Sequence, residues 1–142
     1  MSLTEDIESL LPHRKPFLFV DEIISADEKG SVSEHTFTED EFFFKGHFPE
    51  YPVVPGVILV ETMAQAGGAA LSYQKTFEEG SLFFLATVDS VKFRNQVRPN
   101  DKVRMEITNL RVSPKMVKQS GKAYVGETLC AEATWMCLIG NA

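Results

Sequence analysis

Two side chains that can exchange protons interrupt a largely apolar segment between residues 46 and 65. His47 lies in a loop punctuated by prolines, and Glu61 lies about one and a half turns into a helix expected to begin near Pro55 and Gly56. Burying an uncompensated carboxylate costs several kcal/mol, so an apolar setting raises its pKa instead. Such a carboxyl can act as a general acid near neutral pH, and an imidazole can act as the base. The pair therefore predicts acid–base catalysis.

Three further residues of the same segment are expected to support this pair. Gln65 follows Glu61 by about one helical turn, so its amide can donate a hydrogen bond that holds the carboxyl in one orientation. Gly56 opens the helix, where free backbone N–H groups can hold a developing oxyanion. Gly46 permits an unusual backbone angle beside His47. Base, acid and oxyanion donor would then lie within one short segment.

Each candidate also has an ordinary structural interpretation. A lone Glu61 can simply reach solvent or an arginine across a subunit contact, and His47 can be a loop histidine bound to a backbone carbonyl. The apolar, glycine and proline neighbours weigh against both. We interpret His35 as a strand-face residue and His13 as a structural residue. No second His or Cys lies at a ligand spacing from His47, so neither a metal nor another cofactor is expected.

Composition indicates a single soluble domain spanning residues 1–142, with 44% hydrophobic and 24% charged residues. No stretch reaches the roughly 18 uncharged apolar residues of a membrane span, and the acidic N-terminus does not resemble a signal peptide. A cytoplasmic location is therefore expected. Cys130 and Cys137 point to opposite faces of one expected strand, so they cannot bridge each other and should be reduced core residues. The net charge of −6 disfavours nucleic acid as a partner.

Sequence patterns predict an α+β architecture in which a bent antiparallel sheet wraps one central helix. A short amphipathic helix is expected over 1–11. Strands are expected at 17–24, 31–38, 82–94, 101–110, 112–118, 121–127 and 128–139. The segment from Gly56 to about Lys75 is apolar on nearly every face, which is typical of a buried helix. Its Gly67 and Gly68 indicate that a flat surface approaches the helix closely.

Five segments of the chain closely resemble the FabZ-type 3-hydroxyacyl-acyl-carrier-protein dehydratases. They are LPHRKPFLFVD at 11–21, FFKGHFP at 43–49, PVVPGV at 52–57, ETMAQAGG at 61–68 and FRNQVRPND at 93–101. They stand in the family's order and span nearly the whole chain. The resemblance implies the hot-dog fold, a long central helix wrapped by a bent antiparallel β-sheet. It also implies homodimers, commonly joined as a trimer of dimers.

The resemblance assigns roles residue by residue. It makes His47 and Glu61 catalytic, Gly56 the oxyanion glycine and Gln65 the residue that supports the acid. It implies dehydration of (3R)-3-hydroxyacyl-acyl-carrier-protein to the trans-2-enoyl product in type II fatty acid biosynthesis, with His47 and Glu61 of one site supplied by different subunits. Related dehydratase-isomerases carry Asp at the position of Glu61, so the chain resembles the plain dehydratase. Departures from the family pattern at Glu50 and Val54, and at Asn95, Gln96 and Asn100, concern surface and tunnel detail.

Charge suggests where an acidic partner would bind. Five cations lie between residues 92 and 104, with Asp101 as the one acidic residue among them: Lys92, Arg94, Arg98, Lys102 and Arg104. Acyl carrier proteins are strongly acidic, so we hypothesise that Lys92, Arg94 and Arg98 dock the carrier. The alternative is an ordinary solvated strand face.

Two other functions fit the same residues. One is an acyl-CoA thioesterase or hydratase of the hot-dog superfamily, and thioester hydrolysis would need a carboxylate placed to activate water. A non-catalytic acyl-binding module would bind acyl carrier or acyl-CoA without turnover. Fold resemblance alone does not separate these possibilities.

Overall fold

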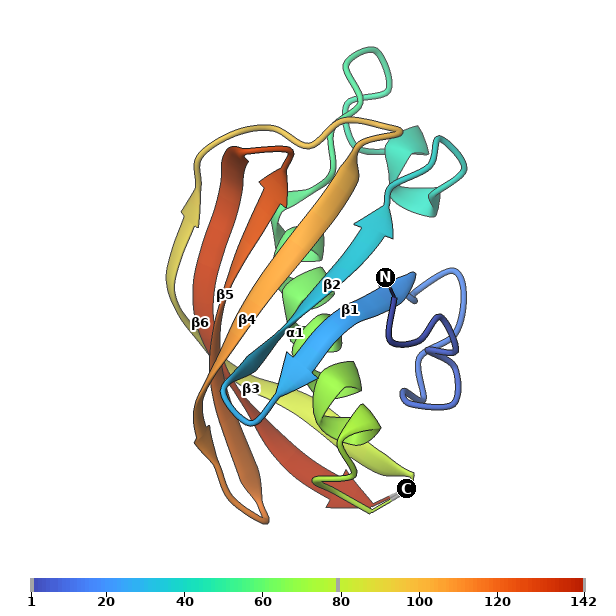
Figure 1. Ribbon diagram of the computed structural model, residues 1–142. Coiled ribbons are helices and arrows are strands. Elements are labelled where there is room, and N and C mark those ends of the chain that lie inside the picture. The colour runs from blue at the N-terminus through green and yellow to red at the C-terminus, as the bar shows by residue number, and fades with distance from the viewer. Residues whose placement is uncertain (1, 79, 142) are drawn as a thin grey trace.

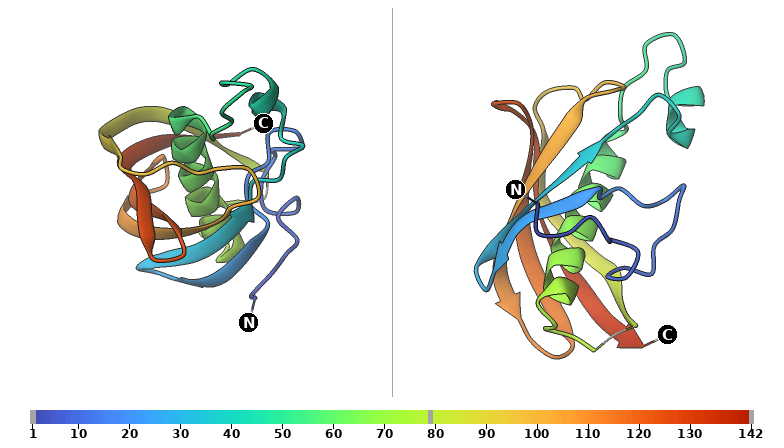
Figure 2. Two further views of the ribbon diagram at one scale, coloured as in Figure 1. Left: turned by 90° about the horizontal axis from the view of Figure 1, so that it is seen from above. Right: turned by 45° about the vertical axis from the view of Figure 1, so that its right-hand side comes forward.

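An antiparallel sheet of six strands curves around one long helix in the part of the chain that the structure describes, residues 2–78 and 80–141 (Figure 1). The computed structural model gives the spatial strand order β1-β2-β4-β5-β6-β3. The strands are β1 Glu22–Asp27, β2 Gly30–Thr36, β3 Ser81–Phe93, β4 Lys102–Val112, β5 Met116–Val125 and β6 Thr128–Asn141. Seen from above, the sheet wraps around the helix α1, Gly56–Tyr73 (Figure 2).

Helix α1 forms where the sequence changes from a proline-rich loop to an uninterrupted apolar run. Pro55 stands at the N-terminal boundary, and its carbonyl accepts hydrogen bonds from the N–H groups of Ile58 and Leu59. The chain leaves the helix near Lys75, which takes a left-handed φ of 60°. Side chains on nearly every side of α1 are buried, as expected of a helix that fills a curved sheet. The predicted central helix is confirmed.

The two glycines inside α1 allow the sheet to approach the helix backbone. A Cβ at Gly67 would overlap the side-chain amide of Gln119 on β5, whereas a Cβ at Gly68 would lie 3.4 Å from the ring of Phe83. Gln119 is itself held, because its Oε1 accepts from Nε1 of the fully buried Trp135 at 3.2 Å. The close approach that the sequence predicts is therefore a contact between helix backbone and a buried polar side chain.

Strand β3 differs from the other strands because it lies at one edge of the sheet and is largely exposed. It pairs with β6 on one side, and the other side ends the sheet. Four of its large apolar side chains are exposed: Phe84, Leu85, Val88 and Phe93. An exposed apolar edge strand is unusual for a monomer and typical of an interface.

The segment between β2 and α1 forms a projection at the top of the molecule in Figure 1. It contains the 3-10 helix η1, Phe42–Lys45, whose Phe43 and Phe44 are buried. Phe43 packs against the rings of Phe19 and Phe37 at centroid distances of 6.1 and 6.0 Å. Through these contacts the segment that carries η1 packs against the rest of the domain.

Two predicted elements at the N-terminal end are wrong. Residues 2–11 form turns and no helix, because their backbone pairs elsewhere: the N–H of Leu3 donates to the carbonyl of Ile23 at 2.7 Å. The first strand begins at Glu22 and not near residue 17, because the backbone at Phe19 bonds to the side chain of Gln65. The amphipathic pattern still marks buried positions, since Ile7 and Leu11 lie in the core.

The strands predicted at 112–118 and 121–127 are one strand, β5. Ser120 and Gly121 resemble a turn, but they pair with Thr134 and Ala133 on β6. Gly121 is needed here because a Cβ would lie 2.6 Å from the ring of Trp135. The small residue therefore makes room for the core and does not reverse the chain. Cys130 and Cys137 are both free and buried, as expected.

Candidate active site

His47 is placed by η1, and its ring is held by a backbone carbonyl. Its backbone N–H donates to the carbonyl of Phe43 at 2.9 Å, and its ring Nδ1 lies 3.0 Å from the carbonyl oxygen of Val53. Because a carbonyl can only accept, Nδ1 carries the proton in this hydrogen bond, and in the neutral ring Nε2 keeps its lone pair. This is the tautomer that a general base requires.

The unusual backbone angle beside His47 belongs to Phe48 and not to Gly46. Gly46 has φ −113° and ψ −17°, which any residue can adopt. Phe48 instead has φ 55°, a conformation that costs free energy for a residue with a side chain. The carbonyl of Phe48 then accepts from the N–H of Tyr51 at 2.7 Å, which closes the turn. The expectation for Gly46 was therefore wrong, although backbone strain does occur next to His47.

His47 and Gly56 line the same cavity, which has a volume of about 410 Å³. Phe93 and Arg94, at and after the end of β3, lie on its other side. Within residues 2–78 and 80–141, no hydrogen-bond acceptor is found for the N–H of Gly56, as expected for the first turn of a helix. The cavity thus combines an imidazole with a free backbone donor at a helix N-terminus, where negative charge is stabilised.

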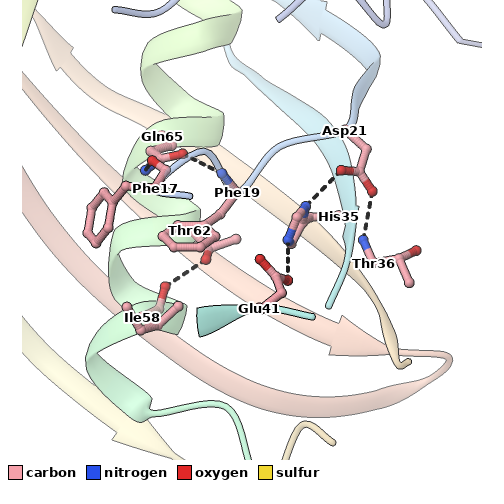
Figure 3. Close-up of polar contacts among 9 residues, drawn as sticks. All are labelled: Phe17, Phe19, Asp21, His35, Thr36, Glu41, Ile58, Thr62 and Gln65. Atoms are coloured by element: carbon pink, nitrogen blue, oxygen red, sulfur yellow. Dashed lines mark hydrogen bonds and ion pairs between the residues drawn. The ribbon is translucent and has the colours of Figure 1, made fainter. Parts of the chain in front are cut away.

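Glu61 is oriented by Gln65, one turn further along α1. Nε2 of Gln65 donates to Oε2 of Glu61 at 2.9 Å, as predicted from their spacing. The same amide donates to the carbonyl of Phe17 at 3.1 Å and accepts from the N–H of Phe19 at 2.8 Å (Figure 3). Gln65 is buried and has its polar groups bonded, so it cannot rotate without breaking several hydrogen bonds.

Glu61 lines a second, much smaller cavity of about 20 Å³, together with His13 and Cys137. Nε2 of His13 lies 3.6 Å from Oε2 of Glu61, whose side chain is 22% exposed in a single chain. Burial lowers the pKa of His13, against a smaller opposing effect of the Glu61 charge. Burial, followed by the Glu61 charge, raises the pKa of the Cys137 thiol to about 11. Burial therefore disfavours the charged forms of both His13 and Cys137.

His13 is the residue of this site that the sequence interpretation missed. It was expected to be structural, yet its ring lies beside the carboxyl of Glu61. The signal that could have found it is its place in the first of the family-like segments, residues 11–21. Its distance from Glu61 follows only from the way residues 11–19 fold back onto α1.

The structure brings some predicted site residues together and keeps others apart. Gly56 lies with His47, and Gln65 lies with Glu61, but His47 and Glu61 line two different cavities of one chain. Strand β3 borders both cavities, through Phe93 near His47 and through Leu85 near Glu61.

The three residues expected to dock a carrier have different surroundings. Arg94 lines the His47 cavity, and its Nε lies 2.7 Å from Oε2 of Glu132. The guanidinium of Arg98 lies over the ring of Tyr51, 4.2 Å from its centroid. Lys92 is exposed and has no ion pair within the described part of the chain. The basic character of this surface is thus partly neutralised at Arg94.

Comparison with known proteins gives consistent results. The FabA-like domain family matches residues 11–134. A 3-hydroxyacyl-acyl-carrier-protein dehydratase FabZ from Desulforamulus reducens is 44% identical over 136 residues, which cover 95% of each chain. A protein of the same name from Koribacter versatilis is 43% identical over 135 residues, covering 94% of this chain and 86% of that one.

Solved structures share the fold at low sequence identity. The dehydratase heterocomplex ApeI:P from Xenorhabdus doucetiae has a TM-score of 0.84 at 16% identity, covering 95% of this chain and 91% of that chain. A thioesterase from Haemophilus influenzae has a TM-score of 0.60 at 17% identity, covering 84% and 78%. At these identities the structures establish the fold alone.

One long helix wrapped by an antiparallel sheet, shared with these structures, defines a hot-dog protein. The extent of the sequence matches gives the particular family: the chain belongs to the FabZ-type 3-hydroxyacyl-acyl-carrier-protein dehydratases. The predicted fold and family are both confirmed. None of the helices in residues 2–78 and 80–141 has the length and apolar character needed to cross a membrane.

Proposed function

We propose that His47 and Glu61 carry out the dehydration of (3R)-3-hydroxyacyl-acyl-carrier-protein to the trans-2-enoyl product. As a FabZ-type dehydratase, the protein is a hydro-lyase of fatty acid biosynthesis. The observation that carries the assignment of residues is the hydrogen bond from Nδ1 of His47 to Val53, because it leaves Nε2 free in a cavity shared with the N–H of Gly56.

The reaction follows from these three groups. Nε2 of His47 takes the C2 proton while the N–H of Gly56 stabilises the negative charge that develops on the thioester oxygen. Glu61 gives its proton to the C3 hydroxyl, which leaves as water, and the C2–C3 double bond forms. The reaction leaves an imidazolium and a carboxylate, and proton transfer between them through solvent restores the starting state. Each of the two side chains should contribute about 10² to 10⁴ in rate.

Two copies of the chain would complete one site. His47 and Glu61 line separate cavities, and β3 borders both of them along an exposed apolar edge. If two β3 strands paired antiparallel about Asp89, Phe93 of one subunit would lie opposite Leu85 of its partner. The His47 cavity of one subunit would then meet the Glu61 cavity of the other. This geometry supports a homodimer, which we further propose assembles into a trimer of dimers.

A mixed dimer tests this arrangement. His47→Ala and Glu61→Gln subunits with different tags are co-expressed, and the dimer that carries both tags is purified. Each parent homodimer should be inactive, whereas the mixed dimer has one site with both defects and one intact site, so it should recover about half of the wild-type activity. A mixed dimer as inactive as its parents would show that each site lies within one chain. Circular dichroism of all three proteins controls for folding.

The docking of acyl carrier protein is proposed from charge and position. Arg94 lines the His47 cavity, and Lys92 and Arg98 flank it in the sequence. An acidic carrier would be attracted to this side of an otherwise acidic protein, and salt would weaken that attraction. The phosphopantetheine thioester would then enter beside His47.

We place the enzyme, as one domain of residues 1–142, in the cytoplasm, where its two free cysteines would stay reduced. Thioester hydrolysis and non-catalytic acyl binding are not favoured, because the curated relatives are dehydratases and thioesterases match only in fold.

A further inference from the structure

His35 on β2 is held between two carboxylates. Its Nδ1 lies 2.8 Å from Oδ1 of Asp21, and its Nε2 lies 2.9 Å from Oε2 of Glu41 (Figure 3). Oδ2 of Asp21 also accepts from the N–H of Thr36 at 2.8 Å. A carboxylate can only accept, and a neutral imidazole can donate through only one of its nitrogens. With both carboxyl groups ionised, both contacts are hydrogen bonds only when the ring carries two protons and a positive charge.

The surroundings favour this charged ring although it is buried. The His35 side chain is 7% exposed and packs edge-on against the ring of Phe37, with centroids 4.6 Å apart. Burial by itself lowers the pKa of His35, but the hydrogen bonds and charges of Asp21 and Glu41 outweigh it and raise the pKa to about 9.

Two lysines interact with Asp21, one of the carboxylate partners of His35. Lys15 lies near enough to Asp21 to lower its pKa further, although His35 has the larger effect. On β4, Lys102 is paired with Glu34 at 3.0 Å and also interacts with Asp21. The ring itself therefore faces two acidic groups, one from the segment before β1 and one from the segment before η1.

Glu41 connects His35 to the loop that carries His47. Glu41 immediately precedes η1, and its carbonyl accepts from the N–H of Phe44 at 3.2 Å. At the other end of this single turn, the carbonyl of Phe43 accepts from the N–H of His47 at 2.9 Å. A short 3-10 turn has little stability of its own, so its position depends on tertiary contacts such as this one.

We propose that His35 is a positioning residue for His47: its doubly protonated ring bridges Asp21 and Glu41 and thereby fixes η1 against the sheet. The inference rests on the proposed role of His47 as the base. Without the bridge, η1 would be held mainly by Phe43 and Phe44, and the His47 ring would sample more positions. A catalytic group displaced by about 1 Å can cost about 10²-fold in rate.

The first experiment observes the ring in the wild-type protein. Nitrogen-15 NMR of labelled histidine should show His35 protonated on both nitrogens at neutral pH and titrating near pH 9. A His35 that titrates near the ordinary value of about 6.5 would overturn the proposal.

The second experiment compares variants that keep or remove the charge. His35→Gln should lower kcat by about 10²-fold with KM little changed, and should speed hydrogen exchange in residues 42–47 but not in α1. His35→Lys, which restores a cation, should recover part of kcat. Wild-type kcat and exchange in His35→Gln, measured beside an inactive His47→Ala, would overturn this inference and leave the proposed site intact. An active His47→Ala would instead overturn the site itself.

If His35→Gln does not fold, Glu41→Gln tests the positioning role of His35 instead. It keeps a neutral acceptor opposite His35 and removes one charge, so it should fold, lower kcat and speed exchange in residues 42–47. Unchanged kcat and exchange in Glu41→Gln would contradict the proposal.

Discussion

Gln65 and Glu61 form a hydrogen bond of 2.9 Å on one face of α1, and Gln65 is in turn bonded to the backbone of residues 17 and 19. The orientation of the acid therefore depends on a segment that lies far from it in the sequence. The next residues of that segment lead to Asp21, which binds His35 (Figure 3). Residues 17–21 thus contact Gln65, which orients Glu61, at one end. At the other end they contact His35, which we propose positions the His47 loop.

Replacing Gln65 by Leu should lower both stability and activity. The N–H of Phe19 would be left buried without an acceptor, at a cost of about 1–3 kcal/mol in the free energy of unfolding. Glu61 would lose its donor, and kcat should fall by about tenfold, the equivalent of about 1.4 kcal/mol. Urea unfolding and steady-state kinetics measure the two effects.

Thr62→Val is a matched control on the same helix. The buried Thr62 hydroxyl donates only to the carbonyl of Ile58 within α1, and that carbonyl can keep its helical partner. This variant should leave kcat unchanged. Wild-type kcat in Gln65→Leu would mean that Glu61 needs no support from the amide.

Replacement by alanine should destabilise the protein at Gly67 but not at Gly68. Gly67→Ala places a methyl group on the buried amide of Gln119 and should cost about 1–3 kcal/mol in the free energy of unfolding. Gly68→Ala meets Phe83 at 3.4 Å, so the gain in helix propensity of up to about 1 kcal/mol should balance or exceed the crowding. Urea unfolding should give a lower midpoint for Gly67→Ala than for Gly68→Ala, and equal midpoints would contradict this prediction.

Charge reversal near the His47 cavity should weaken the use of carrier-bound substrate. Lys92→Glu with Arg94→Glu should raise KM for 3-hydroxyacyl-acyl-carrier-protein, most strongly at low salt, and should change KM for the acyl-CoA analogue much less. Lys29→Glu, with the same type of charge change in the exposed turn between β1 and β2, is the control. If all variants kept the wild-type KM for the carrier substrate, the docking surface would lie elsewhere.

Stability should decrease at alkaline pH because of His35. Its pKa is raised from 6.5 to about 9 on folding, so its stabilising contribution is complete below about pH 6.5 and is lost as the pH rises through 9. The shift corresponds to about 2–3 kcal/mol, allowing for the half-exposed Asp21 partner. Urea unfolding at pH 7 and pH 10 measures the loss. In His35→Gln the difference between these two pH values should be smaller, and an equal difference would contradict the assignment.

Elements with a strong local pattern were predictable. The helix from Gly56 was recognisable because it is apolar over several turns. Strands were also expected near β1 and β2, which pair in the structure. The break expected between strands 112–118 and 121–127 was wrong because a serine before a glycine favours a turn locally. Trp135 on the paired strand β6 instead requires Gly121 in mid-strand. Local propensity cannot reveal a requirement that comes from non-local packing.

The sequence by itself determined which chemical groups are present and which of them share a helix face or a loop. It placed Gln65 one turn from Glu61, and it placed His47 just before the helix that begins at Gly56. These relationships depend only on helical geometry and on proline and glycine, so they can be read without a fold.

Only the tertiary structure decided how those groups are oriented and ionised. The carbonyl of Val53 selects the tautomer of His47, and the backbone at residues 17 and 19 anchors Gln65. The separation of His47 from Glu61 into two cavities, and the ion pairs of His35, also arise from contacts between distant segments. Hydrogen bonds and burial depend on distances in space, which spacing along the chain does not specify.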